Sequence, residues 1–238
     1  MNGVLGTIRT SQDRCDFIRD NTEILTPPLV PEMSLHLATE VVELWEKTEA
    51  ELEDMALPPP FWAFAWAGGQ ALARYVLDNP GLVEGRRVLD FGAGSGMVAI
   101  AAGMAGAAEV TAVDICAFAQ DAILLNAKVN GVKIARETRD ILDEEPDVDV
   151  LLCGDVFYER PLADRLLAWI DRAQARGAAV LVGCPGRTYL PKERLEEVAV
   201  YSVPVTRVLE DADIKRTAVR RLKPSGETQG GEAQGDAG

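Results

Sequence analysis

Several residue types are scarce in this sequence, and each shortage excludes a class of site. A single histidine, His36, excludes any centre that needs two imidazoles, and we expect it to be a packing or surface residue. The four cysteines form no C-x-x-C pair, so the sequence predicts four reduced thiols and no metal site. The longest run of small and apolar residues, 97–108, is well short of the ~20 needed to cross a bilayer. We therefore expect neither a metalloprotein nor a membrane-spanning protein.

Basic residues are also in the minority. Lysine and arginine number 24 against 38 aspartates and glutamates, which gives a formal net charge of −14. Such a surface repels nucleic acid and anionic lipid, so we expect neither as a main partner. The start of the chain has neither the apolar core of a secretory signal nor the Arg-rich, acid-poor character of a transit peptide, which predicts a cytoplasmic protein. With 47% hydrophobic residues, the chain can build the core of one large α/β domain.

From residue 86 onward, short apolar runs alternate with amphipathic segments of helical length. This alternation is typical of a parallel sheet built from βαβ units. The expected strands are 86–92, 109–115, 132–138, 148–154 and 178–184, and the expected helices are 95–105, 117–130 and 160–176. A helix at 191–197 and two alternating segments, 198–205 and 214–222, predict an antiparallel pair that closes the sheet. The predicted fold is α/β, with a doubly wound, Rossmann-like sheet of seven strands.

The chain before the sheet predicts a separate extension. Three prolines in 22–31 favour an extended linker, and Ser34 offers an N-cap for an amphipathic helix that runs to Met55. Four aromatic residues alternate within 61–66, which indicates an extended segment before a helix at 70–77. We expect an N-terminal linker and helical extension over 1–60, the sheet domain over 61–223 and a disordered tail over 224–238.

Glycines cluster where the first strand turns into the first helix. In Asp90-Phe91-Gly92-Ala93-Gly94-Ser95-Gly96 they permit positive φ and let a ligand approach the backbone, although tight turns use glycine without binding anything. Asp114 ends the second strand about 20 residues later, where a carboxylate can accept hydrogen bonds from ribose hydroxyls. A nucleoside-bearing ligand is therefore the leading hypothesis.

The spacing of the glycines favours one nucleoside over another. The dinucleotide fingerprint G-x-G-x-x-G would need a third glycine at position 97, where the sequence has Met97. Asp90 places a carboxylate where a pyrophosphate would be repelled and a cationic α-amino group attracted. This combination favours S-adenosylmethionine. Asp140, after the third strand, could accept from the adenine amino group, although such an acid is more often a loop or cap residue.

The motif VLDFGAGSG, the acid in AVDI and the closing hairpin resemble the seven-strand, class I S-adenosylmethionine methyltransferases over roughly 86–222. The resemblance implies the strand order 3-2-1-4-5-7-6, with the last strand antiparallel. It also implies a cofactor site in the loops after strands one to four, with Trp66 in a lid near the methionine end, and S-adenosylhomocysteine as the product. The residues expected to bind the cofactor are Trp66, Asp90, Gly92, Gly94, Gly96, Asp114, Ile115, Asp140 and Ile141.

After the fourth strand, Asp155-Val156-Phe157-Tyr158 resembles the D-x-x-Y motif of a branch of protein lysine methyltransferases. With PPPFWAFAWAGGQALARYVLDNP and the segment before it, the chain is similar to bacterial lysine methyltransferases of the electron-transfer flavoprotein β subunit. The resemblance implies a protein substrate that presents lysine, with that β subunit as the first candidate and ribosomal proteins as further ones. Asp155 is then expected to orient the lysine amine, while Phe157 and Tyr158 flank its methylene stem.

Other interpretations compete with this one. Asp155 could cap the helix that begins near Pro161, although Glu159 or Arg160 suits that position better, and Phe157 could be an ordinary core aromatic. Three other functions are compatible with the same pattern. They are an NAD-dependent oxidoreductase of similar topology, a binding module without turnover, and a methyltransferase acting on a small amine such as nicotinamide.

Overall fold

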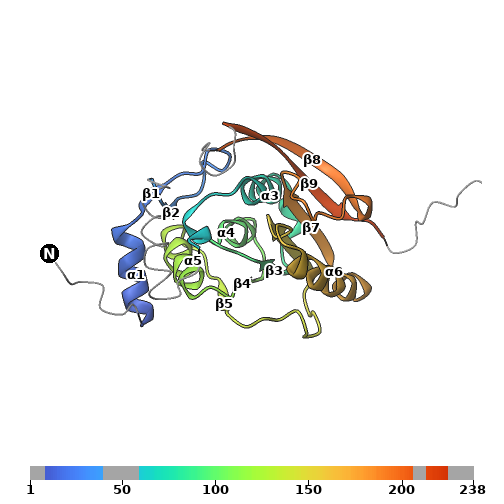
Figure 1. Ribbon diagram of the computed structural model, residues 1–238, viewed down its shortest axis with the longest axis horizontal. Coiled ribbons are helices and arrows are strands. Elements are labelled where there is room, and N and C mark those ends of the chain that lie inside the picture. The colour runs from blue at the N-terminus through green and yellow to red at the C-terminus, as the bar shows by residue number, and fades with distance from the viewer. Residues whose placement is uncertain (1–8, 40–58, 206–212, 225–238) are drawn as a thin grey trace, which may run out of the picture.

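Within the residues that the computed structural model describes, 9–39, 59–205 and 213–224, a seven-stranded mixed sheet forms the centre of the molecule. Its strands are β3 (Arg87–Phe91), β4 (Glu109–Val113), β5 (Ala135–Glu137), β6 (Val150–Gly154), β7 (Ala179–Cys184), β8 (Leu195–Pro204) and β9 (Ile214–Leu222). Their spatial order is β5-β4-β3-β6-β7-β9-β8, and β9 runs antiparallel to both of its neighbours (Figure 1). The predicted order 3-2-1-4-5-7-6 with an antiparallel last strand is confirmed.

Helices cover both faces of this sheet because its central strands are apolar on both sides. In β6, Leu152 packs with Leu181 in one core, whereas Leu151 packs with Trp169 in the other, as the period of two along a strand requires. The first face is covered by α3 (Ala67–Asp78), α4 (Met97–Met104) and α5 (Ala117–Val129), and the second by α6 (Arg160–Ala175) (Figure 1). The carboxyl ends of the parallel strands are left to the loops that carry the candidate site.

Glycines let α3 lie directly against the carboxyl ends of β6 and β7. A Cβ on Gly68 would lie 2.3 Å from the carbonyl oxygen of Gly183, and a Cβ on Gly183 would lie 2.2 Å from the carbonyl oxygen of Gly68. No side chain fits at either position. The helix expected at 70–77 therefore begins earlier, at Ala67, where its first turn faces these two strands.

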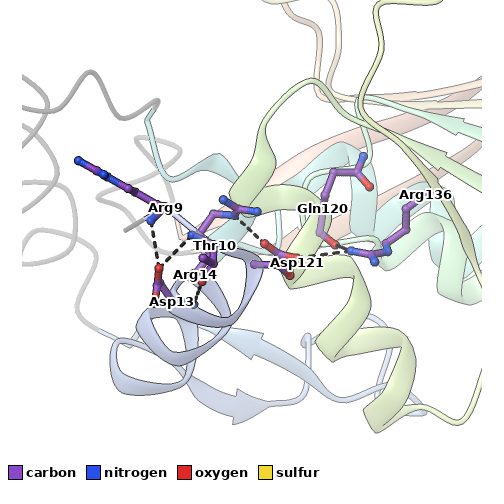
Figure 2. Close-up of polar contacts among 8 residues, drawn as sticks. Arg9, Thr10, Asp13, Arg14, Gln120, Asp121 and Arg136 are labelled. Carbon is purple, nitrogen blue, oxygen red and sulfur yellow. Dashed lines mark hydrogen bonds and ion pairs between the residues drawn. The ribbon is translucent and has the colours of Figure 1, made fainter. Parts of the chain in front are cut away.

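The N-terminal extension docks on α5 through helix α1 (Ser11–Asp20), which the sequence analysis did not predict. Thr10 and Asp13 form a capping box at its start, and their T-x-x-D spacing is the local signal that indicates this helix. The buried Asp121 carboxylate of α5 accepts a hydrogen bond from the Arg14 guanidinium at 2.6 Å (Figure 2). The Ser11 hydroxyl donates to the same carboxylate, also at 2.6 Å.

A two-stranded sheet, β1 (Glu23–Leu25) with β2 (Leu35–Leu37), lies where the linker and the start of the next helix were predicted. The predicted helix is wrong at this point because α5 side chains hold the β2 segment in extended form. The Asn126 amide oxygen accepts from His36 N–H at 2.7 Å, and the Asn130 amide oxygen accepts from Ser34 N–H at 3.0 Å. The rest of that predicted helix, 40–55, lies outside the described residues.

Two other predicted segments differ from the structure. The helix predicted at 191–197 is wrong: Lys192–Arg194 form a single 3₁₀ turn, and β8 begins at Leu195 because this residue pairs with Leu222 of β9. The aromatic segment 61–66 begins with a 3₁₀ turn, Phe61–Ala63, because Trp62 is drawn in to stack on Phe118. Most of the predicted disordered tail, 225–238, lies outside the described residues.

Candidate active site

The glycine turn between β3 and α4 has the backbone conformation that the sequence predicted. Gly92, Gly94 and Gly96 have φ values of 67°, 53° and 79°, in the left-handed region that favours glycine. A Cβ on Gly92 would lie 2.7 Å from a Val156 methyl group, so that position also excludes a side chain for steric reasons. At Gly94 the nearest atom to a Cβ would be the Phe61 carbonyl oxygen, at 3.9 Å. A ligand can therefore approach the backbone of the turn closely at Gly94.

Asp114 joins the end of β4 to this turn. Its carboxylate accepts hydrogen bonds from the Gly94 and Cys116 amides, each at 2.9 Å. Burial raises the pKa of Asp114, and the two amide donors oppose that rise. Next to it, the Ile115 side chain is 77% exposed, which is unusual for an isoleucine in a folded domain. The pair thus offers a hydrogen-bond acceptor and an apolar surface side by side, as a ribose and its base require.

Asp90 lies beneath the glycine turn. Its side chain is 1% exposed, and one carboxylate oxygen accepts from the Ala99 amide in the first turn of α4 at 3.0 Å. Desolvation by burial, with a smaller contribution from the Asp114 charge, raises the pKa of Asp90 to about 8. The sequence analysis expected this carboxylate to attract a cationic amino group. The structure adds a partner that was not predicted, the amino end of the helix that the turn begins.

Asp140 and Ile141 follow β5 at the same edge of the sheet. Asp140 accepts from the Leu142 amide at 3.1 Å and pairs with Arg165 of α6 at 2.7 Å. The Arg165 guanidinium lowers the pKa of Asp140, so this carboxylate is ionised at neutral pH. Ile141 is 7% exposed and belongs to the core on the α6 side of the sheet. Asp140 therefore acts as a loop residue, which was the alternative considered in the sequence analysis, and its side chain is still partly exposed.

Asp155 comes directly after β6, with φ of 57°, a conformation that aspartate tolerates better than most residues. One carboxylate oxygen accepts from the Gly68 amide at 2.5 Å, and the other accepts from the Arg187 Nε at 2.9 Å. The side chain of Asp155 is 10% exposed. It does not cap α6, whose N-cap is Glu159. Instead, it meets the first turn of α3.

A cluster of aromatic side chains reaches this carboxylate through Arg187, which pairs with Asp155 and lies over the Trp66 ring. The Phe61 ring lies 5.8 Å from the Trp66 ring and 6.0 Å from the Tyr158 ring, measured between centroids. Phe61 is 40% exposed and Tyr158 is 50% exposed, so both present apolar surface at the rim. Trp66 is the N-cap residue of α3 and donates its indole N–H to the Phe61 carbonyl at 2.9 Å. The segment predicted to form a lid passes beside the glycine turn, where the Phe61 carbonyl oxygen is the atom nearest to a Cβ on Gly94.

The structure moves one predicted residue away from the candidate site and adds one that was not predicted. Phe157 is 0% exposed and packs in the core on the α6 side, so the structure supports its interpretation as a core aromatic. Arg187, which the sequence analysis did not single out, contacts Asp155 and lies over the Trp66 ring at 5.8 Å. Arg187 follows β7, and loops after neighbouring parallel strands meet at one edge, so this position was the available signal.

The residues at this edge fit S-adenosylmethionine. The turn is open at Gly94, the Asp114 carboxylate lies at the end of the second parallel strand, and the exposed Ile115 follows it. No group of three or more His, Cys, Asp or Glu side chains in the described ranges is placed to hold a metal ion, and no helix in them is long and apolar enough to span a membrane. Fold and site together define a class I, S-adenosylmethionine-dependent methyltransferase.

Comparisons with known proteins narrow this class. Residues 70–157 match the family model of the ribosomal protein L11 methyltransferase, PrmA. The chain is 37% identical to the electron transfer flavoprotein beta subunit lysine methyltransferase of Mus musculus over 87% of this chain and 84% of that protein. Its counterpart in Danio rerio is 38% identical over 89% and 84%, and the Caenorhabditis elegans homolog is 33% identical over 85% and 93%. This chain belongs to the family of electron transfer flavoprotein beta subunit lysine methyltransferases, and it is a protein-lysine methyltransferase.

Proposed function

We propose that this chain methylates lysine side chains of the electron transfer flavoprotein β subunit. The observation that carries the proposal is the position of Asp155, a nearly buried carboxylate at the carboxyl end of β6. Asp155 lies against the amino end of α3, and the aromatic residues Phe61 and Trp66 directly precede this helix. A carboxylate beside aromatic rings suits an alkylamine better than an anionic or purely apolar acceptor. The names of the relatives support the flavoprotein β subunit as the protein that presents the lysine.

The residues around Asp155 have separate tasks in this proposal. S-adenosylmethionine supplies an electrophilic methyl group on a sulfonium sulfur. The Asp155 carboxylate accepts an N–H of the lysine amine and so fixes the direction of the nitrogen lone pair. Tyr158 and Phe61 lie along the methylene stem, where an aromatic face also favours the cationic product by ~0.5–2 kcal/mol. The proton that the lysine must lose before it reacts leaves through the exposed rim to water.

Binding of the cofactor is assigned to the other strand ends. Asp114 accepts hydrogen bonds from the ribose hydroxyls, Ile115 borders the adenine, and Asp140 lies close to the adenine amino group. Ile141 contributes its backbone, because its side chain is buried in the core on the α6 side. The amides of the turn at Gly92, Gly94 and Gly96 face the methionine portion, and Trp66 covers it. Asp90 supports the same turn from beneath through α4. The positions described above and the family resemblance support these assignments.

Ribosomal proteins are a second candidate substrate, on the strength of one observation. The matched PrmA region, 70–157, contains the glycine turn and ends within the D-x-x-Y motif. It leaves out β7 and Arg187, which pairs with Asp155, together with β8 and β9. The match therefore supports the cofactor half of the site more than the choice of acceptor. The flavoprotein subunit remains the better supported substrate.

The deciding experiment uses tritiated S-adenosylmethionine and two cell lysates, one intact and one from cells without the flavoprotein. We expect the purified enzyme to label a protein of the size of the β subunit in the intact lysate and not in the other. Mass spectrometry of the recombinant β subunit should then locate the methyl groups on lysine. Label on ribosomal proteins in both lysates would favour the second candidate, and label confined to small molecules would contradict protein methylation altogether.

Asp155→Asn tests the central residue with little change of shape. Asparagine keeps an acceptor for the Gly68 amide and tolerates positive φ, but it removes the charge. We expect turnover to fall by a hundredfold or more while the dissociation constant for S-adenosylhomocysteine stays within a few-fold. Asp164→Asn is the matched control, since Asp164 is an exposed acid on α6 whose loose pair with Arg160 is 3.8 Å long. Retained turnover in Asp155→Asn would remove this residue from the mechanism.

A further inference from the structure

Arg187 lies beside the proposed acceptor carboxylate without belonging to the D-x-x-Y motif. Its Nε donates to the Asp155 carboxylate at 2.9 Å, and its guanidinium carbon lies 5.8 Å from the centre of the Trp66 ring. Its backbone is held as well, because the Cys184 sulfur accepts the Arg187 N–H at 3.2 Å. The Arg187 side chain is 24% exposed. The loop after β7 therefore holds a cation in a fixed place next to the site of methyl transfer.

The reaction makes the charge of Asp155 important. A lysine nitrogen forms a bond to the methyl carbon only as the neutral amine, because the ammonium form has no lone pair. An unpaired carboxylate with little solvent around it stabilises that ammonium and raises its pKa. Asp155 is not such a carboxylate, because one oxygen accepts from Gly68 and the other is paired with Arg187. An arriving lysine meets a positive charge together with the negative one.

Other ionisable groups near Asp155 come from the elements packed around it. Cys184, at the end of β7, has a thiol whose pKa is raised by burial and by the Asp155 charge. Tyr158, after β6, has a pKa raised by burial and by nearby carboxylates. The first turn of α3 contributes the Gly68 amide and carries no ionisable side chain. Neither Cys184 nor Tyr158 is charged at neutral pH, so neither balances Asp155.

Among the described residues, a second cation lies on β9, the strand next to β7 in the sheet. Arg220 of β9 donates to the Cys184 carbonyl at 3.2 Å, and its charge is paired with Glu197 of β8 at 3.3 Å. Arg187, in contrast, contacts the Asp155 carboxylate directly. Among the described residues, Arg187 is therefore the cation whose removal changes the charge next to Asp155.

We propose that Arg187 is a positioning residue of the methyl-transfer site: by balancing the charge of Asp155, it lets the acceptor lysine bind as the neutral amine. This inference rests on the proposed lysine methylation. Asp155 retains lone pairs with which it can orient the amine, while Arg187 keeps the carboxylate from trapping the ammonium form. The nitrogen loses its proton to water, bonds to the methyl carbon as the carbon–sulfur bond breaks, and leaves as a methylammonium group.

The test is the pH dependence of kcat in Arg187→Met and Arg187→Lys, with saturating recombinant flavoprotein β subunit and S-adenosylmethionine between pH 6.5 and 10. The kcat profile reports groups in the enzyme–substrate complex. We expect the midpoint of the rising limb to move up by about one pH unit in Arg187→Met, and to stay in place in Arg187→Lys. The midpoint is read within one preparation, so a partly unfolded variant does not distort it.

Three results would overturn the inference. A lower kcat at every pH with an unmoved midpoint in Arg187→Met would show that Arg187 only supports the loop. A lower KM with an unmoved midpoint would show that Arg187 competes with the lysine for Asp155. A wild-type enzyme that methylates no lysine would overturn the proposed function and this inference with it, and only this result affects both.

Arg87→Met provides the matched control. Arg87 pairs with Asp149 at 2.9 Å at the amino ends of β3 and β6, the opposite edge of the same sheet. Arg87→Met removes an arginine–aspartate ion pair, as Arg187→Met does, but at the end of the sheet opposite to the candidate site. We expect the rising limb of the kcat–pH profile of Arg87→Met to have the same midpoint as that of the wild type. Binding of S-adenosylhomocysteine, measured by calorimetry, should be within a few-fold of the wild type in both methionine variants.

Discussion

The Asp90 carboxyl group accepts a hydrogen bond from the Ala99 amide at 3.0 Å, which ties β3 to the first turn of α4 beneath the glycine turn. Because the pKa of this fully buried acid is raised to about 8, the folded protein keeps Asp90 protonated at pH values where the unfolded chain has released the proton. The folded state then binds more protons than the unfolded state between about pH 4 and 8. The contribution of Asp90 to stability is therefore present at low pH and is lost as pH rises through 8.

Asp90→Asn should remove the loss of stability that Asp90 causes as the pH rises toward 8. We expect the free energy of unfolding of the variant, minus that of the wild type, to increase steadily from pH 5 to pH 8. Urea unfolding at four pH values in the absence of cofactor measures this difference, and its slope is informative even if asparagine fits less well. Asp143→Asn is the control, because the side chain of Asp143 is 89% exposed. A pH-independent difference for Asp90→Asn would contradict the raised pKa.

Gly68→Ala tests the close contact between α3 and the sheet. Alanine normally stabilises a helix by about 1 kcal/mol relative to glycine. Here the new Cβ would lie 2.3 Å from the Gly183 carbonyl oxygen and 2.5 Å from the Asp155 carboxylate. Since the Gly183 oxygen is backbone and cannot turn aside, we expect a loss of about 1–3 kcal/mol or more in the free energy of unfolding.

Gly81→Ala supplies the comparison for that experiment. A Cβ on Gly81 would have nothing within 4 Å, and the residue lies in a short helical turn away from the site. We expect its urea midpoint to be unchanged or slightly raised. Equal stability of Gly68→Ala and Gly81→Ala would show that α3 can move off the sheet without cost.

Much of the fold could be predicted because the spacing of apolar residues along the sequence matches the pattern of buried side chains in the structure. The runs VLLCG of β6 and AVLVGC of β7 are buried almost throughout, as central parallel strands are, and both were placed within two residues. The helix predicted after Ser34 was wrong for a related reason. Leu35 and Leu37 suit a helix as well as a strand, and what decides between them is Asn126 and Asn130, some 90 residues further along.

The sequence pointed to the motif residues of the candidate site, but it gave no sign of the residues that contact them. The glycines and Asp114 stand out because their spacing follows from the chemistry of a bound nucleoside. Arg187 belongs to no spacing rule, since its contact with Asp155 depends on how far the loop after β7 reaches across the sheet edge. The helix α1 was missed because its hold on the domain comes from Asp121, whose ion pair spans more than 100 residues of sequence.

Ile115→Ala should weaken cofactor binding without weakening the fold. The side chain is 77% exposed, so its loss removes little from the core, but a bound adenine would cover it. If the adenine covers about two of the CH₂ equivalents that the substitution removes, worth ~0.8 kcal/mol each on burial, binding of S-adenosylhomocysteine should weaken roughly tenfold. Ile214→Ala is the matched control, since Ile214 of β9 is 63% exposed and lies away from the glycine turn. Equal affinities of the two variants would contradict the adenine assignment of Ile115.

Asp121→Ala should free α1 while leaving the sheet intact. The carboxylate, 3% exposed, receives the Arg14 guanidinium and the Ser11 hydroxyl, and its removal leaves the half-buried Arg14 without this partner (Figure 2). We expect backbone amides of 11–20 to exchange with deuterium at least tenfold faster, while those of β6 and β7 keep their protection. Asp16→Ala, which breaks an exposed pair with Arg19 on the same helix, should change the exchange of 11–20 much less. Equal exchange in the two variants would mean that the contacts of Phe17 and Ile18 hold α1 without the ion pair.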